Sequence, residues 1–266
     1  MSETESGTSL GEATDLLSCR SLEVGYRGQA ILPPITLGFG RGQFWAVVGR
    51  NGSGKSTWLR TLLGLLPPVR GSIEHAEPGL RIAYLPQRHG TDELYPLLAR
   101  EVVALGALRG WGFLRPGLST AKERAERALE EVGARDLGDQ LFRELSEGQK
   151  QRVLFARLAA SEARLAVLDE PTSAMDLVAE REAFELLDAL RKNRNMTVVV
   201  VSHYLRAVRE FADRAIMLDR DSASVIIGTP AFVLEHSAFL ARYGEVEASD
   251  SAVSRGHALT QGDGNA

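Results

Sequence analysis

The chain has 266 residues, of which 44% are hydrophobic and 25% are charged, and its formal net charge is −4. This size and balance fit one globular body or two closely joined subdomains, and the slightly acidic charge disfavours nucleic acid as the main partner. Cys19 is the single cysteine, which excludes an intrachain disulfide and a cysteine-built zinc site.

The two ends of the chain are polar and contain little that could be buried, so we predict disordered tails at 1–15 and 246–266. The N-terminus has acidic residues where a signal peptide needs basic ones. The longest apolar runs are strand-sized, far short of the roughly 20 residues that span a bilayer. The sequence therefore predicts a cytoplasmic protein that meets the membrane only through a partner.

The strand-like segment 44–48 is followed by a glycine-rich segment and then by an apolar-faced helix, which is the order of a phosphate-binding loop. Glycines allow successive backbone N–H groups to point at one anion. Lys55 adds a mobile positive charge for the β- and γ-phosphates, and the Ser56 hydroxyl can ligate magnesium. We therefore predict that a nucleoside triphosphate contacts Gly49, Asn51, Gly52, Ser53, Gly54, Lys55, Ser56 and Thr57.

Further strands are predicted on both sides of this loop by apolar alternation and by bounding turn residues. Tyr26 follows the first of them and Gln87 follows the last. Taken singly, each is an ordinary edge or turn residue. The predicted strands are at 16–24, 35–39, 70–73 and 80–85.

From about residue 88 to 162 the pattern becomes helical. A capping box at 120–123 predicts the start of a helix that continues to Val132. Ser146, with Gln149 three residues later, predicts the start of a second helix. Read alone, this second segment is equally well explained by helix capping and by a functional role.

A buried strand at 165–168 ends in the adjacent carboxylates Asp169 and Glu170. In a chain with a phosphate loop, one carboxylate can hold magnesium while the other polarises the attacking water as a general base. The β-branched run at 197–201 leads to His203, and a lone histidine at a strand end is more often structural than catalytic. The remaining predicted elements are helices at about 178–192 and 205–213, strands at 214–218 and 224–227, and a short helical end from 228.

Residues 16–245 together resemble the nucleotide-binding subunit of ATP-binding-cassette (ABC) transporters. The resemblance rests on the order, spacing and residue type of several short motifs. The first motifs in chain order are Tyr26 as the adenine-stacking aromatic, 49–57 as the phosphate loop and Gln87 as the glutamine loop. The signature sequence follows at 145–149, and the magnesium-binding strand with the catalytic glutamate is at 165–170. The last two are the D-loop at 173–176 and His203 as the switch histidine.

The resemblance implies an α/β fold of the P-loop NTPase type. It implies a RecA-like mixed sheet core with an N-terminal antiparallel β subdomain and an inserted α-helical subdomain at about 88–162. Lys55, Glu170 and His203 would be catalytic, and Mg²⁺ would be held with ATP by Ser56, Gln87 and Asp169. In a head-to-tail homodimer, the ATP site of one copy would be completed by the other copy's Ser146, Gly148 and Gln149.

The resemblance also implies partners. ATP would bridge two copies of the chain, and hydrolysis would release them. Separate integral membrane permease subunits would carry the cargo, with a substrate-binding protein in the complex, so the chain would lie in the cytoplasm on the inner face of the membrane. The segments 228–234 and 239–244 resemble the tails of zinc- and manganese-importer ATPases, which implies import of a divalent metal.

Three positions depart from the family pattern. Glu147 replaces the first of two signature glycines, and its carboxylate either repels the γ-phosphate or points outward. We expect the outward orientation because Ser146 and Gly148 remain available. Tyr204 follows the switch histidine where the family often has an acidic residue, and Met175 replaces a leucine.

Two other functions are compatible with a phosphate-binding loop. A soluble, non-transport ABC-type ATPase acting on nucleic acid or the translation machinery commonly carries paired cassettes, coiled-coil insertions or zinc modules, and this sequence has one phosphate loop, no heptad run and one cysteine. A nucleotide-binding regulator with negligible turnover is disfavoured by Glu170 and His203. The sequence therefore favours an ATPase that drives a separate permease.

Overall fold

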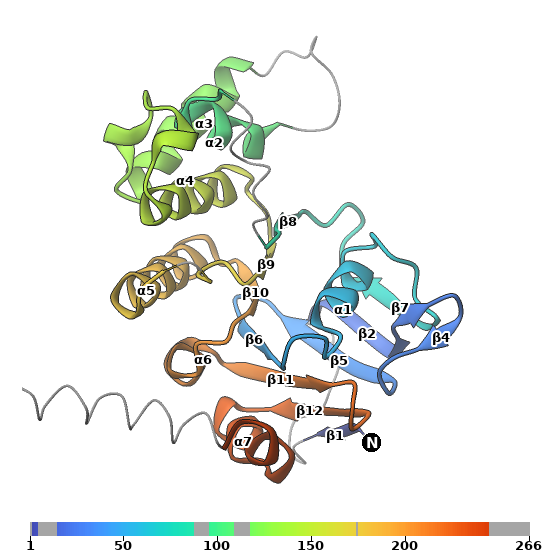
Figure 1. Ribbon diagram of the computed structural model, residues 1–266. Helices are drawn as coiled ribbons and strands as arrows, with labels where there is room; N and C mark the ends of the chain where they lie inside the picture. The colour runs from blue at the N-terminus through green and yellow to red at the C-terminus, as the bar shows by residue number, and fades with distance from the viewer. Residues whose placement is uncertain (1, 5–14, 88–95, 109–117, 174, 245–266) are drawn as a thin grey trace, which may run out of the picture.

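The computed structural model describes residues 2–4, 15–87, 96–108, 118–173 and 175–244, and Figure 1 shows its arrangement. A seven-stranded sheet runs through its centre, with parallel pairing between all neighbours except β11 and β12, which are antiparallel. Its strands, in spatial order, are β1 (Ser2–Thr4), β12 (Ser224–Gly228), β11 (Arg214–Asp219), β6 (Phe44–Val48), β10 (Thr197–Val201), β9 (Leu165–Asp169) and β8 (Ile82–Leu85).

The central strands β6, β10 and β9 are buried along their whole length. Their side chains alternate between two hydrophobic clusters, so that Val198 faces one side of the sheet and Val199 the other. A parallel sheet covered on both faces favours continuous apolar strands, which is why β10 consists of a threonine and four valines.

On one face the sheet packs against α1 (Lys55–Leu62) and an antiparallel subdomain. This subdomain contains the strands β5 (Ile35–Gly40), β2 (Asp15–Glu23) and β7 (Arg70–His75), in that spatial order. The short strands β3 (Gly25–Tyr26) and β4 (Gln29–Ala30) form a hairpin beside them. The predicted strands in this part of the chain are confirmed.

The helices α2 (Ala99–Ala107), α3 (Leu118–Glu131) and α4 (Glu147–Ala160) gather at the top of Figure 1, with two 3₁₀ turns at Arg135–Leu137 and Phe142–Glu144. The capping box predicted at 120–123 does not start α3, because Thr120 already lies inside the helix and a capping residue needs a non-helical backbone. By contrast, the capped start of α4 at Ser146 is confirmed. Residues 88–95 and 109–117 of this predicted helical region lie outside the described residues.

Three helices follow in the C-terminal half: α5 (Leu177–Arg194), α6 (Leu205–Phe211) and α7 (Pro230–Glu235), after which residues 237–244 are also helical. The prediction that 1–15 is a disordered tail is wrong at two places, because β1 pairs with the edge of β12 and Asp15 begins β2. Edge pairing uses backbone groups, which a composition argument does not assess. The predicted tail at 246–266 lies outside the described residues.

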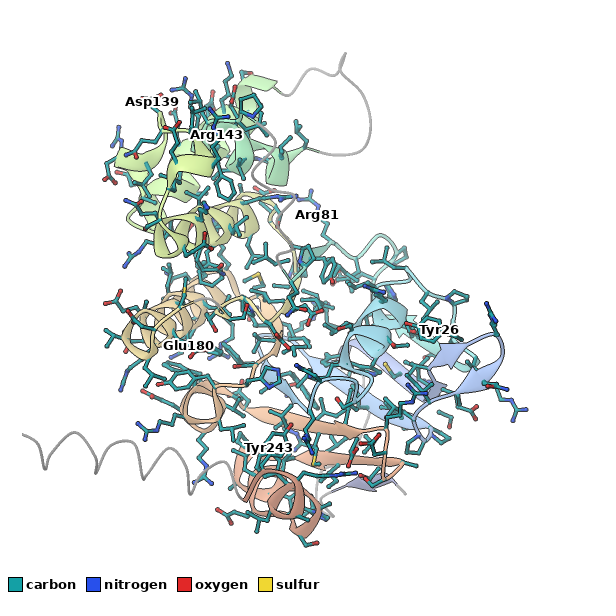
Figure 2. All side chains as sticks on the ribbon, in the orientation of Figure 1. Tyr26, Arg81, Asp139, Arg143, Glu180 and Tyr243 are labelled. Atoms are coloured by element: carbon teal, nitrogen blue, oxygen red, sulfur yellow. The ribbon has the colours of Figure 1, made fainter. Side chains whose placement is uncertain are left out.

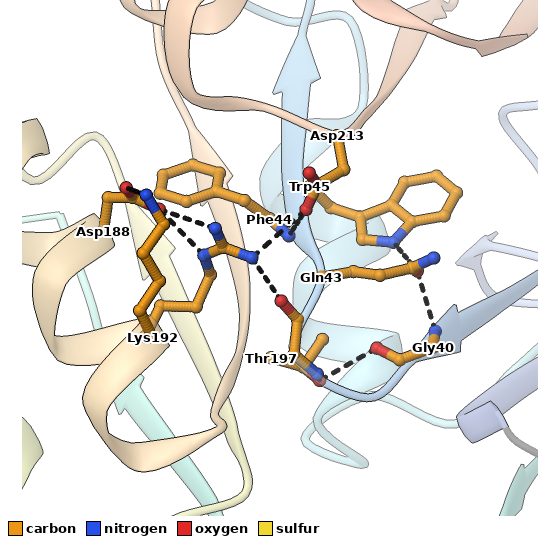
Figure 3. Close-up of polar contacts among 10 residues, drawn as sticks. Gly40, Gln43, Phe44, Trp45, Asp188, Lys192, Thr197 and Asp213 are labelled. Carbon is orange, nitrogen blue, oxygen red and sulfur yellow. Dashed lines mark hydrogen bonds and ion pairs between the residues drawn. The ribbon is translucent and has the colours of Figure 1, made fainter.

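One cluster of polar contacts joins α5 to the start of β6 (Figure 3). The guanidinium of Arg191 donates to Asp188 Oδ1 at 2.9 Å, to the carbonyl oxygen of Gly42 and to Asp213 Oδ2 at 3.3 Å. Asp213 Oδ2 in turn accepts from the backbone N–H of Phe44 at 2.7 Å. We refer to Arg191, Asp188, Gly42 and Asp213 as the Arg191 cluster, and it ties α5 to the strand that leads into the glycine-rich loop.

Thr197 adds a second connection at the same end of the sheet (Figure 3). Its hydroxyl accepts from the N–H of Gly42 at 3.0 Å and donates to the carbonyl of Gly40 at 2.9 Å. Gln43 Oε1 accepts from Gly40 N–H and from the Trp45 indole, each at 2.8 Å. The turn before β6 is therefore held on both sides by bonds to β10 and to its own strand.

Candidate nucleotide site

The glycine-rich loop connects the end of β6 to the start of α1, at the carboxyl edge of a central parallel strand. Gly52 and Gly54 have φ angles of 82° and 101°, which side chains rarely adopt, and Gly54 is the N-cap of α1. A Cβ on Gly49 would lie 2.6 Å from the carbonyl oxygen of Leu218. Glycine at these positions therefore lets the backbone curl in front of the N-terminus of α1.

Lys55 is buried, with 6% of its surface exposed, and its Nζ donates to the carbonyl oxygens of Gly49 at 2.6 Å and Arg50 at 3.1 Å. Burial lowers the pKa of Lys55, and the carboxylates of Glu170 and Asp169 partly oppose this shift.

Ser53 Oγ is also buried in the loop and has no hydrogen-bond partner among the described residues. Asn51 and Gly52 are exposed at the tip of the loop, and Thr57 is buried behind it. A curled backbone, a cation and an unpaired hydroxyl together form a site for a phosphate group.

Asp169 is the last residue of β9 and is 5% exposed. Its Oδ2 accepts from the Ser56 hydroxyl at 3.3 Å. Burial is the largest cause that raises the pKa of Asp169, and the neighbouring Glu170 carboxylate raises it further. A buried carboxylate beside a hydroxyl is a pair of hard oxygen donors, so these residues fit a magnesium ion.

Three polar residues follow three neighbouring strands of the sheet, and Glu170 is the middle one, in contact with the other two. Its Oε2 accepts from Gln87 Nε2 at 2.7 Å, and its Oε1 lies 2.8 Å from His203 Nε2. Gln87 follows β8, Glu170 follows β9 and His203 follows β10, so the parallel order of the sheet brings them together.

The backbone of Glu170 has a φ of 49°, a left-handed conformation that is uncommon for a residue with a side chain. Such a conformation costs free energy, persists only where the surroundings enforce it and occurs mainly at functional sites. The N–H of Glu170 donates to the carbonyl of Val201 at 3.1 Å, which fixes the residue at the end of β10.

Tyr26 lies on the β3–β4 hairpin beside α1 (Figure 2) and is 49% exposed. Its hydroxyl is 3.0 Å from Thr57 Oγ1, which connects the hairpin to the first turn of α1. The ring is therefore close to the glycine-rich loop and accessible to a ligand.

The signature segment begins α4 and is separate from the glycine-rich loop. Ser146 Oγ accepts from Gln149 N–H at 3.3 Å, and Gln149 Oε1 accepts from Ser146 N–H at 2.9 Å. Glu147 Oε1 accepts from Lys150 Nζ at 2.9 Å, in line with the expected outward orientation of this carboxylate. Figure 1 shows α4 and α1 as well-separated helices, so the signature helix and the glycine-rich loop lie in different parts of one protomer.

Two residues near Glu170 were not predicted from the sequence, namely Thr172 in the turn before α5 and Glu180 on α5 itself. Thr172 Oγ1 donates to Glu180 Oε1 at 2.6 Å. The sequence signal that could have identified Glu180 is its position in the first turn of α5, four residues after the N-cap Asp176. Asp176 caps this helix, since its Oδ1 accepts from the N–H groups of Val178 and Ala179.

The two remaining departures from the expected pattern are structural. Tyr204 packs the edge of its ring against Phe184, with the ring centroids 6.3 Å apart, and Met175 packs against the same hydrophobic cluster.

A glycine-rich loop between a central parallel strand and a helix, with a buried carboxylate on a nearby strand, defines a P-loop NTPase. The family model for ABC transporters matches residues 32–173, and the chain belongs to this family. It is the ATP-binding and ATP-hydrolysing subunit of an ABC transporter, with the cassette fold expected from the sequence.

The chain is similar to several zinc import ATP-binding proteins. It is 35% identical to ZnuC of Yersinia enterocolitica over 242 residues, covering 91% of this chain and 90% of that protein. It is 37% identical to ZnuC of Pseudomonas entomophila over 232 residues, covering 86% and 84%.

The fold is similar to that of solved ABC transporter components. A structure described as an inward-facing metal-chelate type ABC transporter matches with a TM-score of 0.75 and 30% identity, over 85% of this chain and 87% of that chain. The cbiO1 protein of Clostridium perfringens matches with a TM-score of 0.73 over 91% and 99%, and at 24% identity it supports the fold alone. Within the described ranges, no helix is both long and apolar enough to cross a membrane.

Proposed function

We propose that Glu170 is the general base for ATP hydrolysis. The observation that carries this proposal is the position of its carboxylate, which lies between Gln87 and His203 and directly follows Asp169. When ATP is bound, Glu170 would orient and polarise a water molecule for attack on the γ-phosphate. His203 would contact the same phosphate from the end of β10.

The remaining site residues would hold the nucleotide. Lys55 would exchange its bonds to the loop carbonyls for bonds to the β- and γ-phosphates, and the ring of Tyr26 would stack on adenine. Ser56 and Asp169 would hold Mg²⁺ together with Gln87, and the ion would neutralise charge on the phosphate oxygens.

We further propose that two copies of the chain bind ATP head to tail. Ser146, Gly148 and Gln149 of one copy would contact the γ-phosphate bound by the other, with the N-terminus of α4 acting as an anion site. The separation of α4 from α1 within one chain supports this arrangement.

The substitution Glu170→Gln tests both proposals. It should lower ATP turnover by at least about 100-fold because the general base is lost. ATP binding should remain, and ATP should convert the variant to a stable dimer in size-exclusion chromatography with light scattering.

The matched control is Glu185→Gln, an exposed carboxylate on α5 that pairs with Arg181. It should hydrolyse ATP at the wild-type rate. Near-normal turnover by Glu170→Gln would reject the general-base role, and a variant that binds ATP but stays monomeric would reject the head-to-tail dimer.

We propose that the cassette, residues 16–245, drives zinc import through a separate permease. The similarity to ZnuC proteins supports this cargo. The helical region at about 88–162, with Gln87 at its start, would contact the permease, so the chain would lie on the inner face of the membrane. A substrate-binding protein would complete the importer.

Transport in vesicles that contain the permease and this chain tests the cargo. We expect ATP-dependent uptake of Zn²⁺ that Glu170→Gln abolishes. Uptake of a metal chelate with no uptake of free Zn²⁺ would overturn the zinc proposal and leave the ATPase intact.

A further inference from the structure

Among the described residues of the turn that follows Glu170, two backbone hydrogen bonds lie within the turn itself. Within the turn, Ser173 N–H reaches the carbonyl of Glu170 at 3.4 Å, and Met175 N–H reaches the carbonyl of Thr172 at 3.0 Å. The left-handed backbone of Glu170 needs surroundings that enforce it. Glu170 itself is held from outside the turn, by Val201 at its N–H and by Gln87 and His203 at its carboxylate. A contact that fixes the rest of the turn, beyond Glu170, would complete this support.

The side-chain bond between Thr172 and Glu180 is such a contact. At 2.6 Å it has the length of a well-formed hydrogen bond from a hydroxyl to a carboxylate. Thr172 is 5% exposed, so its hydroxyl would be costly to leave without a partner. Glu180 lies on α5 (Figure 2), a helix whose start is itself fixed by the Asp176 cap.

Glu180 also lies within electrostatic reach of the site. Burial raises its pKa, and this effect is opposed first by the Thr172 hydrogen bond and then by the imidazole of His203. The carboxylate is therefore bonded to the turn through Thr172 and lies within electrostatic reach of His203, which follows the neighbouring strand β10.

We propose that Glu180 is a positioning residue for ATP hydrolysis, which fixes the turn that carries Glu170 by accepting the Thr172 hydrogen bond. It does not touch the substrate. This inference rests on the proposed role of Glu170 as the general base.

The test compares kcat and KM for ATP in the full-length chain with its permease. Glu180→Ala and Thr172→Val should each lower kcat about tenfold with little change in KM, because a misplaced base slows the reaction without weakening ATP binding. The double variant should be no slower than either single variant, since both remove the same bond.

Two conservative variants separate positioning from a general loss of structure. Thr172→Ser keeps the hydroxyl and Glu180→Gln keeps the Oε1 acceptor, so both should retain kcat within about twofold. Glu185→Gln on the same helix is the unaffected control. Thermal unfolding of every variant is measured on the same samples.

Wild-type kcat in Glu180→Ala would overturn the proposal, and so would a parallel rise in KM, additive losses in the double variant, or a tenfold loss in Glu180→Gln. Failure of the general-base proposal is visible separately, because Glu170→Gln would then still hydrolyse ATP.

Discussion

At the scale of single residues, Gly148 is a glycine for which the described part of the protomer gives no structural reason. A Cβ built at this position meets no atom within 4 Å, and the residue lies in the first turn of α4. Glycine in a helix costs about 1 kcal/mol relative to alanine. Nothing described within the protomer needs this glycine, which is the expected situation if another molecule approaches it.

We predict that Gly148→Ala raises the free energy of unfolding by about 0.5–1 kcal/mol, since it improves helix propensity. The same variant should lose ATP-dependent dimerisation and most of its ATP turnover, because the added methyl group would stand where the partner's phosphate approaches. Chemical denaturation and steady-state ATPase assays measure the two effects.

Gly106→Ala on α2 is the matched comparison, because its Cβ would lie 2.2 Å from the carbonyl oxygen of Arg157 and should therefore destabilise the fold. Full turnover together with ATP-dependent dimerisation in Gly148→Ala would argue against the proposed partner contact.

At the scale of elements, α5 runs from the carboxyl ends of the central parallel strands to their amino ends. Its N-cap Asp176 follows the turn from Glu170, and Arg191 near its C-terminus belongs to the cluster at the start of β6. The side chains of Arg191 and Asp188 are 13% and 12% exposed. Without Arg191, Asp188 keeps its pair with Lys192, but Gly42 and Asp213 lose their contact with the guanidinium. Removing one partner of a largely buried, hydrogen-bonded ion pair is destabilising.

We predict that Arg191→Met lowers the free energy of unfolding by about 2–4 kcal/mol at neutral pH. Lys192→Met is the control, since Lys192 also pairs with Asp188 but its side chain is 65% exposed, and its loss should cost under about 1 kcal/mol. Urea unfolding measures both, and equal losses in the two variants would contradict the assignment.

The effect of Arg191→Met should depend on pH. Burial alone would raise the pKa of Asp188, but hydrogen bonds from Lys192 and Arg191 outweigh it, so this pKa lies below its usual value. A depressed acid pKa contributes stability above the unfolded-state pKa, and this contribution is lost as pH falls through the folded-state pKa. The difference between Arg191→Met and wild type should therefore shrink in acid.

At the scale of the whole molecule, local patterns predicted most of the core elements. The loop after β6, the capped start of α4 and the carboxylates at the end of β9 each depend on neighbouring residues, and the structure confirms these elements. The resemblance to the ABC family placed Gln87, Glu170 and His203 in one site, and the strand order explains why they meet.

What the sequence did not predict depends on contacts between distant residues. The pairing of β1 with β12 and the Arg191 cluster join segments that no local pattern connects. The Thr172–Glu180 bond is closer in sequence, but it depends on how α5 packs beside the turn. These features arise from the assembled fold.

The position of β6 has a consequence for how the chain is made. Its partners are β10 and β11, and the bonds at its start reach Thr197 and Asp213, which lie 155 residues after Gly42 and 169 residues after Phe44. At roughly 5–20 residues per second of synthesis, these partners leave the ribosome about 10–30 seconds later. The apolar strand before the glycine-rich loop therefore waits for its partners during translation, and a nascent chain becomes able to hold ATP only after Thr197 and Asp213 have been made.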